Sequence, residues 1–381
     1  MSKIKNLNKL LPFVAIGTVA DCQSVLDPTN RLLVRAGLQM MQNQSFDNSG
    51  LTELIKQTGV LEKMQSGYKL TSQDLGFVFS PILNASGRVS HAKLSISTLL
   101  SDYPEAGILA TELIAANQER KQIVKDILVE VETQAREQIL ANASFIWLQG
   151  DWSKGIVGLI ASRLVNQYTV PVIVVSIDEG HASGSLRAPE GYHLPNAMNQ
   201  MIDLFEKCGG HPCAAGFSAT ADSLSDIKDG FTRFLAEQKE NLVSGEIVFY
   251  TKDLVPQHLH HLLVDPKILW LDEGEITTDF IQEVWLLDPF GQDFPFPHLT
   301  FTTILTNVKF MGNNQQHFKT ILSSGVALTA FNIDSDIQKQ LIGGSSISVW
   351  ITAKISQNSW NGQTKNELIV DKIYLQNAKN G

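Results

Sequence analysis

The sequence predicts an α/β chain of several domains, in which helices and a compact α/β region are followed by a small β-barrel of the OB-fold type. Three observations support this prediction. The chain has 381 residues, which is more than one ordinary core organises and favours two or three domains. Its middle part alternates strand and helix patterns. From Leu299 onward, short strands alternate with turns rich in Gly and Asn, which is typical of a small barrel.

Residues 1–101 are expected to form helices and turns. The apolar stretch LLPFVAIGTV ends in a polar turn that contains Asp21. Asn30 and Arg31 then open an amphipathic stretch that is typical of a helix, and SGLTELIKQTGV predicts another short helix.

Residues 102–142 are expected to form one long helix. Apolar residues recur at helical spacing, and neither Gly nor Pro occurs from Ile108 to Leu148. Asp102 and Glu105 have the spacing of a capping box. A helix over Tyr103–Ala141 would span roughly 58 Å, so we expect it to connect two domains rather than to belong to one core.

Residues 143–240 carry the α/β pattern. The run PVIVVS is apolar and β-branched, as in strands buried on both faces. The elements expected around it are strands over Phe145–Leu148, Pro171–Ser176 and Ala182–Arg187, and helices over Gly155–Gln167 and Pro195–Phe205. Residues 241–298 are expected to be a linker with helical segments, which leads into the barrel over residues 299–381.

Composition limits the classes of function. The formal net charge of −9 argues against a broadly basic surface that wraps duplex nucleic acid. From Phe301 to the end, seven Lys stand against four Asp or Glu, which fits either a local groove for a polyanion or ordinary compositional scatter. The three cysteines form neither a disulfide framework nor a zinc knuckle, and no apolar run reaches the roughly 18 residues of a membrane span. We therefore expect a cytoplasmic protein without a membrane partner.

The segment CGGHPCAAGF is the first candidate site. Gly209 and Gly210 let the backbone approach a ligand or take a positive φ, and His211 can donate a hydrogen bond to a phosphate oxygen, so the segment is interpreted as a phosphate-contacting turn. The same spacing also fits a structural Gly-rich loop with an incidental His, and spacing alone favours that interpretation. A zinc site at Cys208, His211 and Cys213 lacks an evident fourth ligand.

Three further segments offer candidate residues. In a strand, Ser185 and Arg187 point to the same face and can clamp an anion, although an edge Arg paired with a surface acid fits equally well. Asn84 opens a small-residue turn that ends at Arg88. Asp21 follows an apolar segment, a usual place for a metal ligand in α/β folds, although local features favour a cap or turn residue.

Taken together, these segments resemble the RecJ-like single-stranded-DNA exonucleases of the DHH superfamily, in order and over nearly the whole chain. Ala15–Asp21 with Asn30-Arg31 looks like the last motif of that family's DHH catalytic domain, and PILNASGR looks like its turn before the connecting helix. DWSKGIVGLIASR, PVIVVS, GSLR and CGGHPCAAGF look like its DHHA1 domain. LDPFGQDFPF looks like its entry into an OB-fold. The resemblance implies a partial DHH domain over residues 1–101, a DHHA1 domain over 143–240 and an OB-fold that guides a single strand.

The resemblance also implies an activity and residue roles. Such enzymes hydrolyse DNA phosphodiesters from a 5′ end with two Mn²⁺ or Mg²⁺ ions, in DNA recombination and repair. Asp21 would be a metal ligand, and His211 would be a catalytic residue that contacts the backbone near the scissile group. The residues that would bind the DNA and its 5′ phosphate are Arg88, Ser185, Arg187, Gly209, Gly210, His211 and Asn84.

One departure from the family is large. Its DxDADG-type motif, a further Asp and its Asp-His-His motif do not occur in this sequence, and Asp21 alone cannot hold two divalent ions. The first hypothesis is a split exonuclease, in which a separate chain brings the DHH motifs and covers apolar surface of residues 1–100. The second is a non-catalytic accessory that binds single-stranded DNA or a repair partner, with a single-strand-binding protein as one candidate. The third is a phosphodiesterase for short oligonucleotides or cyclic dinucleotides, against which the OB-like tail argues.

Overall fold

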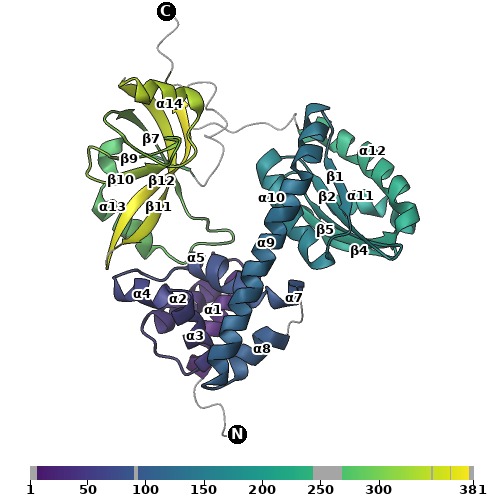
Figure 1. The fold of residues 1–381 in the computed structure, drawn as a ribbon, viewed down its shortest axis with the longest axis horizontal. Coiled ribbons are helices and arrows are strands. Elements are labelled where there is room, and N and C mark those ends of the chain that lie inside the picture. Colours follow the sequence, from purple (N-terminus) through teal and green to yellow (C-terminus); the bar gives the residue numbers. More distant parts are fainter. Residues whose placement is uncertain (1–6, 90–92, 243–267, 345, 361, 377–381) are drawn as a thin grey trace, which may run out of the picture. The chain divides into compact units, whose positions relative to one another are not determined.

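The computed structural model describes residues 7–89, 93–242, 268–344, 346–360 and 362–376. Contacts divide the chain into two compact units, one of Met1–Ser80 with Val248–Gly381 and one of Pro81–Ile247. The chain can be followed through both units by its colour in Figure 1. The expected domain boundaries at 101, 142, 240 and 298 remain predictions, and residues 243–267 of the expected linker lie outside the described part of the chain.

The first unit opens with short helices. They are η1 (Leu7–Leu10), α1 (Leu11–Ala20), α2 (Pro28–Gln42), α3 (Ser49–Gln57), α4 (Val60–Gln65), α5 (Ser72–Asp74) and the π-helical turn η2 (Leu75–Phe79). The amphipathic helix begins two residues before its expected start. The side chain of Asp27 accepts hydrogen bonds from the amides of Thr29 and Asn30 at 2.8 and 3.0 Å, and Pro28 supplies the fixed φ of a first helical residue.

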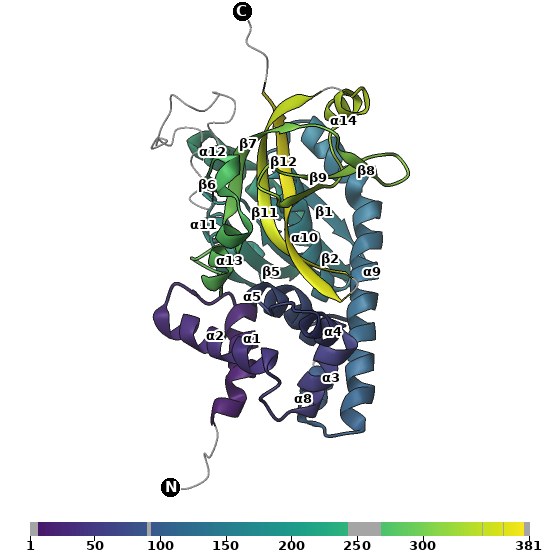
Figure 2. The ribbon, with the colours of Figure 1, turned by 90° about the vertical axis from the view of Figure 1, so that its left-hand side faces the viewer.

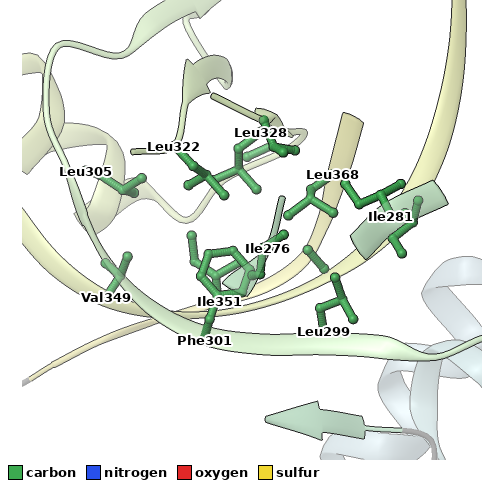
Figure 3. Close-up of a cluster of buried hydrophobic side chains, with 14 of the residues drawn as sticks. Ile276, Ile281, Leu299, Phe301, Leu305, Leu322, Leu328, Val349, Ile351 and Leu368 are labelled. Carbon is green, nitrogen blue, oxygen red and sulfur yellow. The ribbon is translucent and has the colours of Figure 1, made fainter. Parts of the chain in front are cut away.

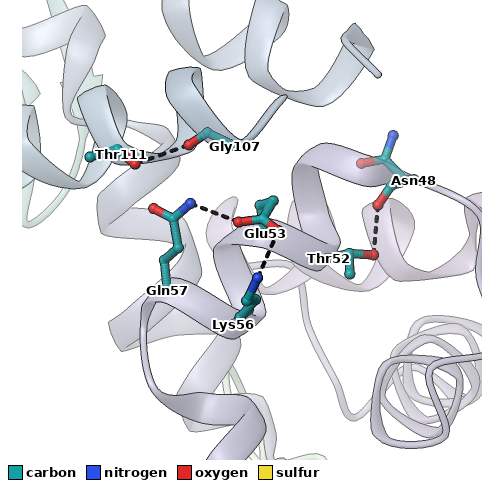
Figure 4. A network of polar contacts seen from close by, with 7 residues as sticks. All are labelled: Asn48, Thr52, Glu53, Lys56, Gln57, Gly107 and Thr111. Atoms are coloured by element: carbon teal, nitrogen blue, oxygen red, sulfur yellow. Dashed lines mark hydrogen bonds and ion pairs between the residues drawn. The ribbon is translucent and has the colours of Figure 1, made fainter. Parts of the chain in front are cut away.

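Polar contacts hold both ends of α3 (Figure 4). At its start, Asn48 caps the helix by accepting a hydrogen bond from the Leu51 amide at 2.8 Å. The backbone carbonyl oxygen of Asn48 also accepts a hydrogen bond from Thr52 Oγ1 at 2.8 Å, as Figure 4 shows. Near its end, the buried carboxylate of Glu53 accepts hydrogen bonds from Lys56 Nζ at 3.4 Å and Gln57 Nε2 at 2.8 Å. A buried carboxylate needs such donors because burial disfavours its charged form.

The second part of this unit is one seven-stranded sheet. Its strands are β6 (Ile268–Trp270), β7 (His298–Leu305), β8 (Lys309–Met311), β9 (His317–Ile321), β10 (Ala327–Ala330), β11 (Ile347–Trp360) and β12 (Gln363–Leu375). The strand order is β6-β7-β11-β12-β10-β9-β8. β11 and β12 form the long curved hairpin in Figure 2, and the helices are η6 (Glu273–Glu275), α13 (Thr278–Leu286) and α14 (Ser335–Ile342).

This part of the chain is rich in strands, as expected, but its sheet does not close into a barrel. Among the described strands, β6 and β8 lie at opposite edges and do not pair with each other. The sheet is nevertheless curved around one hydrophobic core, drawn in Figure 3. Phe301, Phe318 and Leu368 in this core are fully buried. Curvature of this kind buries one face of the sheet without the edge-to-edge pairing that closure requires.

Two arginines of α2 attach the early helices to the segment that precedes the sheet. Arg31 donates to the carbonyl oxygens of Leu287 and Pro289, and its guanidinium lies 4.4 Å from the centroid of the Phe294 ring. Arg35 donates to the carbonyl oxygens of Leu286 and Asp288, each at 3.0 Å. Guanidinium groups suit this role because their donors form a rigid planar fork.

The second unit combines helices with a five-stranded sheet. Its helices are α6 (Ser80–Leu83), α7 (Ser86–Val89), α8 (Lys93–Leu100), α9 (Glu105–Leu140), α10 (Lys154–Tyr168), α11 (Leu194–Asn199), η3 (Ile202–Leu204), η4 (Ala221–Ser223) and α12 (Leu224–Leu242). The strands are β1 (Ile146–Gly150), β2 (Val172–Asp178), β3 (His181–Arg187), β4 (Lys207–His211) and β5 (Ala214–Thr220), in the order β1-β2-β3-β5-β4.

Helices cover both faces of this sheet, as Figure 1 shows. On one face, side chains of α9 and α10 pack with β1 and β2 in a core cluster that includes Ile156, Ile160 and Val174. On the other face, α11 and α12 pack with β2, β3 and β5 around Phe217 and Phe231. The apolar run PVIVVS is therefore buried on both sides, as its composition predicts.

The long helix exists, but its predicted capping box does not. α9 runs over Glu105–Leu140, and its N-cap residue is Pro104, which has no side chain that could accept a hydrogen bond. Asp102 lies outside the cap position, and its backbone carbonyl oxygen accepts a hydrogen bond from the amide of Ala106 at 2.9 Å. Among the described helices, none is both long and apolar enough to cross a membrane.

Candidate phosphate-binding site

The segment Gly209-Gly210-His211 is a strand, not a turn as expected. It forms the end of the edge strand β4, and the turn follows at Pro212 and Cys213. Gly209 pairs with Gly216 and His211 with Ala214 of β5, so backbone pairing extends a segment of small residues that has little strand propensity of its own.

Strand register places the candidate side chains on one face of the sheet. Arg187 of β3 is opposite Ala214, which is also opposite His211. Directly paired residues share a face, so Arg187 and His211 stand on the same side, about 10 Å apart across two strand spacings. In the same way, Ser185 is in line with Gly216 and Gly209. This is the face that α9 and α10 cover over β1 and β2.

Arg187 and Ser185 form a preorganised pair. Nη1 of Arg187 donates to Ser185 Oγ at 3.3 Å and to the carbonyl oxygen of Leu186 at 2.8 Å. Burial, and then the positive charge of Arg88, lower the pKa of Arg187 from its ordinary value. The guanidinium stays protonated near neutral pH, because arginine is an extremely weak acid. Arg187 is therefore a partly desolvated cation beside a hydroxyl group.

Arg88, on α7, lies near enough for its charge to act on Arg187. Its Nη1 donates to the carbonyl oxygen of Gly155, at the start of α10, at 3.0 Å. A Cβ on Gly155 would lie 2.5 Å from the Arg88 carbonyl oxygen, and a Cβ on Gly158 would lie 3.1 Å from Ser185 Oγ and 3.5 Å from Arg187 Nη2. The two glycines let α10 approach both arginines closely.

The two glycines of β4 differ in what surrounds them. Gly210 has φ +149°, and a Cβ there would lie 2.4 Å from the Ala214 carbonyl oxygen, so its absence of a side chain is structural. An added Cβ on Gly209 would meet no described atom within 4 Å. Gly209 and its partner Gly216 therefore leave the sheet bare next to Ser185. A ligand can approach the backbone there.

The remaining predicted residues are less closely tied to this group. His211 is exposed at the end of β4. Asn84 is exposed in the turn between α6 and α7, and no side-chain hydrogen bond of Asn84 is described. The structure thus brings Arg88, Ser185 and Arg187 together, with the glycines and His211 on the same sheet. The roles given to all of these residues remain predictions.

The predicted metal ligand, Asp21, lacks the neighbouring ligands that a two-metal site needs within the described residues. Asp21 lies in the first unit, just after α1, and its Oδ2 accepts a hydrogen bond from Gln23 Nε2 at 2.7 Å. Within the described residues, no group of three or more His, Cys, Asp or Glu side chains could hold a metal ion. The residues present therefore do not fit a Mn²⁺ or Mg²⁺ pair without ligands from elsewhere.

Sequence reasoning missed two arginines near the group. Burial, and then the charges of Arg88 and Arg163, lower the pKa of Arg120 on α9. Arg163 lies on α10, and the two helices pack against each other. The only signal in the sequence was the spacing of Asn117 and Arg120, which places them on one face of the helix.

Comparison with known proteins places both sheet regions in families. The DHHA1 domain family matches residues 138–237, and the RecJ OB domain family matches residues 269–372. The crystal structure of RecJ in complex with Mg²⁺ from Thermus thermophilus is similar with a TM-score of 0.72 at 22% identity, over 98% of this chain and 53% of that chain. This likeness shows the fold.

Curated relatives extend the similarity over nearly the whole chain. The single-stranded-DNA-specific exonuclease RecJ of Bacillus subtilis (strain 168) is 32% identical over 370 residues, which are 95% of this chain and 44% of that protein. The protein of the same name from Escherichia coli (strain K12) is 28% identical over 387 residues, which cover 97% of this chain and 62% of that protein. The chain therefore spans about half the length of these relatives. It is a relative of the RecJ proteins that carries a DHHA1 domain followed by a RecJ OB domain.

Proposed function

We propose that this chain binds the 5′ end of single-stranded DNA as part of a RecJ-type exonuclease. The observation that carries the proposal is the group of Arg88, Ser185 and Arg187 next to the bare backbone of Gly209. Two guanidinium groups and a hydroxyl group can surround a phosphate with charge-assisted hydrogen bonds. In the described part of the chain, no ion pair neutralises either arginine.

The geometry favours a terminal phosphate over an internal one. A 5′-terminal phosphate carries more negative charge than an internal phosphodiester, so it gains more from two cations at one place. The open face over Gly209 leaves room for the following nucleotide, and His211 lies further along the same face. We infer that His211 contacts the backbone near the bond to be cut, and that digestion proceeds from the 5′ end.

The metal ions are proposed to depend on a separate chain that carries the DHH motifs. Asp21 would contribute one carboxylate to that shared site. Apolar side chains on the early helices support such a partner, because Val14, Leu32 and Phe77 are 37%, 67% and 80% exposed. Apolar surface of this kind is stabilised when another protein covers it. DNA repair and recombination would then be functions of the assembled enzyme.

Mixing the two chains tests this proposal. The chain is combined with a chain that carries the DHH motifs, and digestion of a 5′-phosphorylated, 3′-labelled single strand is followed in Mn²⁺. We expect activity in the mixture that exceeds the activity of each chain alone, and its loss in the mixture with Asp21→Asn. Equal activity of the partner alone, or no activity in the mixture, would contradict the split-enzyme proposal.

A binding measurement tests the phosphate site without the partner. The chain alone should bind a 5′-phosphorylated strand more tightly than the same strand with a 5′ hydroxyl. Arg187→Ala should remove that preference. Arg233→Ala, on α12, serves as a control because it removes an exposed arginine that belongs to neither the site nor the bare face.

The alternative is a non-catalytic accessory that holds single-stranded DNA. The basic composition after Phe301 favours it, because the OB region could bind the strand by itself. If binding survives Arg187→Ala but fails when residues 299–381 are removed, the accessory function is preferred. The OB region and the DHHA1 region make separate contributions in the enzyme proposal, so each change should weaken binding.

A further inference from the structure

The loop of residues 188–193 runs between the two ends of the proposed phosphate site. It leaves β3 directly after Arg187 and leads into α11. The turn of Pro212 and Cys213 directly follows His211, the last residue of β4. Contacts between this loop and this turn therefore connect the strand that carries Arg187 with the strand that carries His211.

Three hydrogen bonds attach the turn to the 188–193 loop and to the first residue of α11. The amide of Ala188 donates to the carbonyl oxygen of Cys213 at 2.9 Å, and the amide of Leu194 donates to the carbonyl oxygen of Pro212 at 2.9 Å. Sγ of Cys213 donates to the carbonyl oxygen of Pro189 at 3.5 Å. Both residues of the turn are therefore held from outside the β4–β5 hairpin.

The end of β4 depends on this support. Among the described strands, β4 lies at the edge of its sheet and pairs only with β5. Gly209 and Gly210 lose more backbone entropy on ordering than other residues do, and such small residues have low strand propensity. His211 ends this strand, so the position of its backbone follows from whatever fixes the turn.

The 188–193 loop is itself anchored in the core of the second unit. Ala188 and Tyr192 are each 8% exposed and Leu194 is fully buried, and all three belong to the core cluster that contains Phe217. Between these anchors, Gly191 is exposed and has φ +96°, a conformation that glycine adopts readily. Segments with buried apolar contacts open less readily than exposed ones. The loop is therefore a fixed spacer.

We propose that the 188–193 loop positions His211 relative to Arg187, so that a DNA strand meets both contacts already in place. Tyr192 is the positioning residue, because its buried ring anchors the loop that holds the turn. The loop acts through His211 and needs no contact with DNA of its own. Groups that are ordered before binding lose less conformational entropy on binding, which raises affinity. The inference rests on the proposed function, because it takes the roles of Arg187 and His211 from it.

A double-mutant cycle between Tyr192 and His211 tests this proposal. The full chain is titrated calorimetrically with thymidine 5′-monophosphate and with a 5′-phosphorylated thymidine hexanucleotide. Tyr192→Ala and His211→Ala should each weaken hexanucleotide binding by about fivefold and leave monophosphate binding unchanged. The double variant should bind the hexanucleotide no more weakly than His211→Ala alone, because Tyr192 acts only through His211.

Two matched pairs of variants separate positioning from stability. Leu235 of α12 is fully buried in the same core as Tyr192, so Leu235→Ala and Tyr192→Ala should both lower the melting temperature, whereas only Tyr192→Ala should weaken hexanucleotide binding. Gly191→Ala strains the loop without emptying the core. Gly180→Ala makes the same change at φ +82° in the β2–β3 turn, at the opposite end of β3. Only Gly191→Ala should weaken hexanucleotide binding.

The outcomes distinguish this inference from the proposed function. Equal weakening by Tyr192→Ala and Leu235→Ala, or fully additive losses in the cycle, would refute the positioning role. If circular dichroism shows that Tyr192→Ala does not fold, the cycle is run with Gly191→Ala, and additive losses count against the proposal in the same way. If Arg187→Ala leaves monophosphate binding unchanged, or His211→Ala leaves hexanucleotide binding unchanged, the proposed function fails instead.

Discussion

Adding one methyl group to each glycine of β4 separates the structural role of this pair from its proposed binding role. Gly209→Ala and Gly210→Ala are the same chemical change at adjacent positions of one strand. A Cβ on Gly210 would lie 2.4 Å from both the Ala214 carbonyl oxygen and the Cα of Ala215, at a φ of +149°. A Cβ on Gly209 would meet nothing described within 4 Å.

The two variants should differ in stability by several kcal/mol. A non-Gly residue at such a φ costs about 1–3 kcal/mol, and the backbone overlap adds a further cost, so Gly210→Ala should lower the free energy of unfolding by about 2–4 kcal/mol. For a domain of this size that is a fall in melting temperature of roughly 4–16 °C. Gly209→Ala should leave stability unchanged or raise it by about 0.5–1 kcal/mol, because Ala loses less backbone entropy than Gly.

Binding should show the opposite order. The methyl group of Gly209→Ala stands on the bare face in register with Ser185, two strand spacings away, where the strand backbone is proposed to approach. We expect it to weaken binding of a 5′-phosphorylated strand by about tenfold, a free-energy change of about 1.4 kcal/mol, as measured by fluorescence anisotropy. Calorimetric melting of the same samples gives the stability. If Gly209→Ala binds DNA as wild type does, the bare face is not a binding surface, and the reasoning is refuted.

Three further changes test contacts inside the units. Burial raises the pKa of the Asp288 carboxyl group, although Ser72 donates hydrogen bonds to it. The stabilising contribution of the protonated carboxyl group is therefore present at acid pH and is lost as pH rises through the raised pKa. Asp288→Asn should remove this pH-dependent loss of stability from urea midpoints taken between pH 4 and 8, and an unchanged pH profile would contradict the link to Asp288. Gly184→Ala should cost about 1–3 kcal/mol, because its Cβ would lie 2.1 Å from the Phe217 ring; the double variant with Phe217→Leu should recover most of that cost in denaturant melts. Glu367→Ala should cost about 1–3 kcal/mol by leaving three donors of the OB sheet without an acceptor, whereas Glu367→Gln should cost less, and equal losses would argue against the hydrogen-bond explanation.

Much of the fold of the second unit could be predicted from local pattern. The 36-residue helix α9 follows from helical spacing without Gly or Pro, and β2 follows from its β-branched apolar run. The local pattern of each of these elements is strong enough to predict its conformation. The strand identity of Gly209–His211 could not be predicted in this way, because its small residues have low strand propensity and its conformation is set by pairing with β5.

Long-range polar contacts were beyond the reach of sequence reasoning. Arg31 and Arg35 read as the polar side of an amphipathic helix, yet they bind carbonyl oxygens more than 250 residues away. The sequence likewise predicts Arg120 to be a solvated residue on the polar side of a helix. In each case the side chain's role depends on which backbone or charge lies opposite, and only tertiary packing decides that.

The arginines also show why burial and charge must be considered together. A surface arginine is commonly paired with an acid, and such a pair contributes little to stability. Arg187 is partly buried, its near neighbours include a second cation, and its hydrogen bonds go to a hydroxyl and a carbonyl group. Packing holds this charge where neither water nor a carboxylate fully compensates it. An arrangement that is unfavourable for the protein alone would become favourable if a phosphate entered, and this difference is the physical basis of the proposed phosphate site.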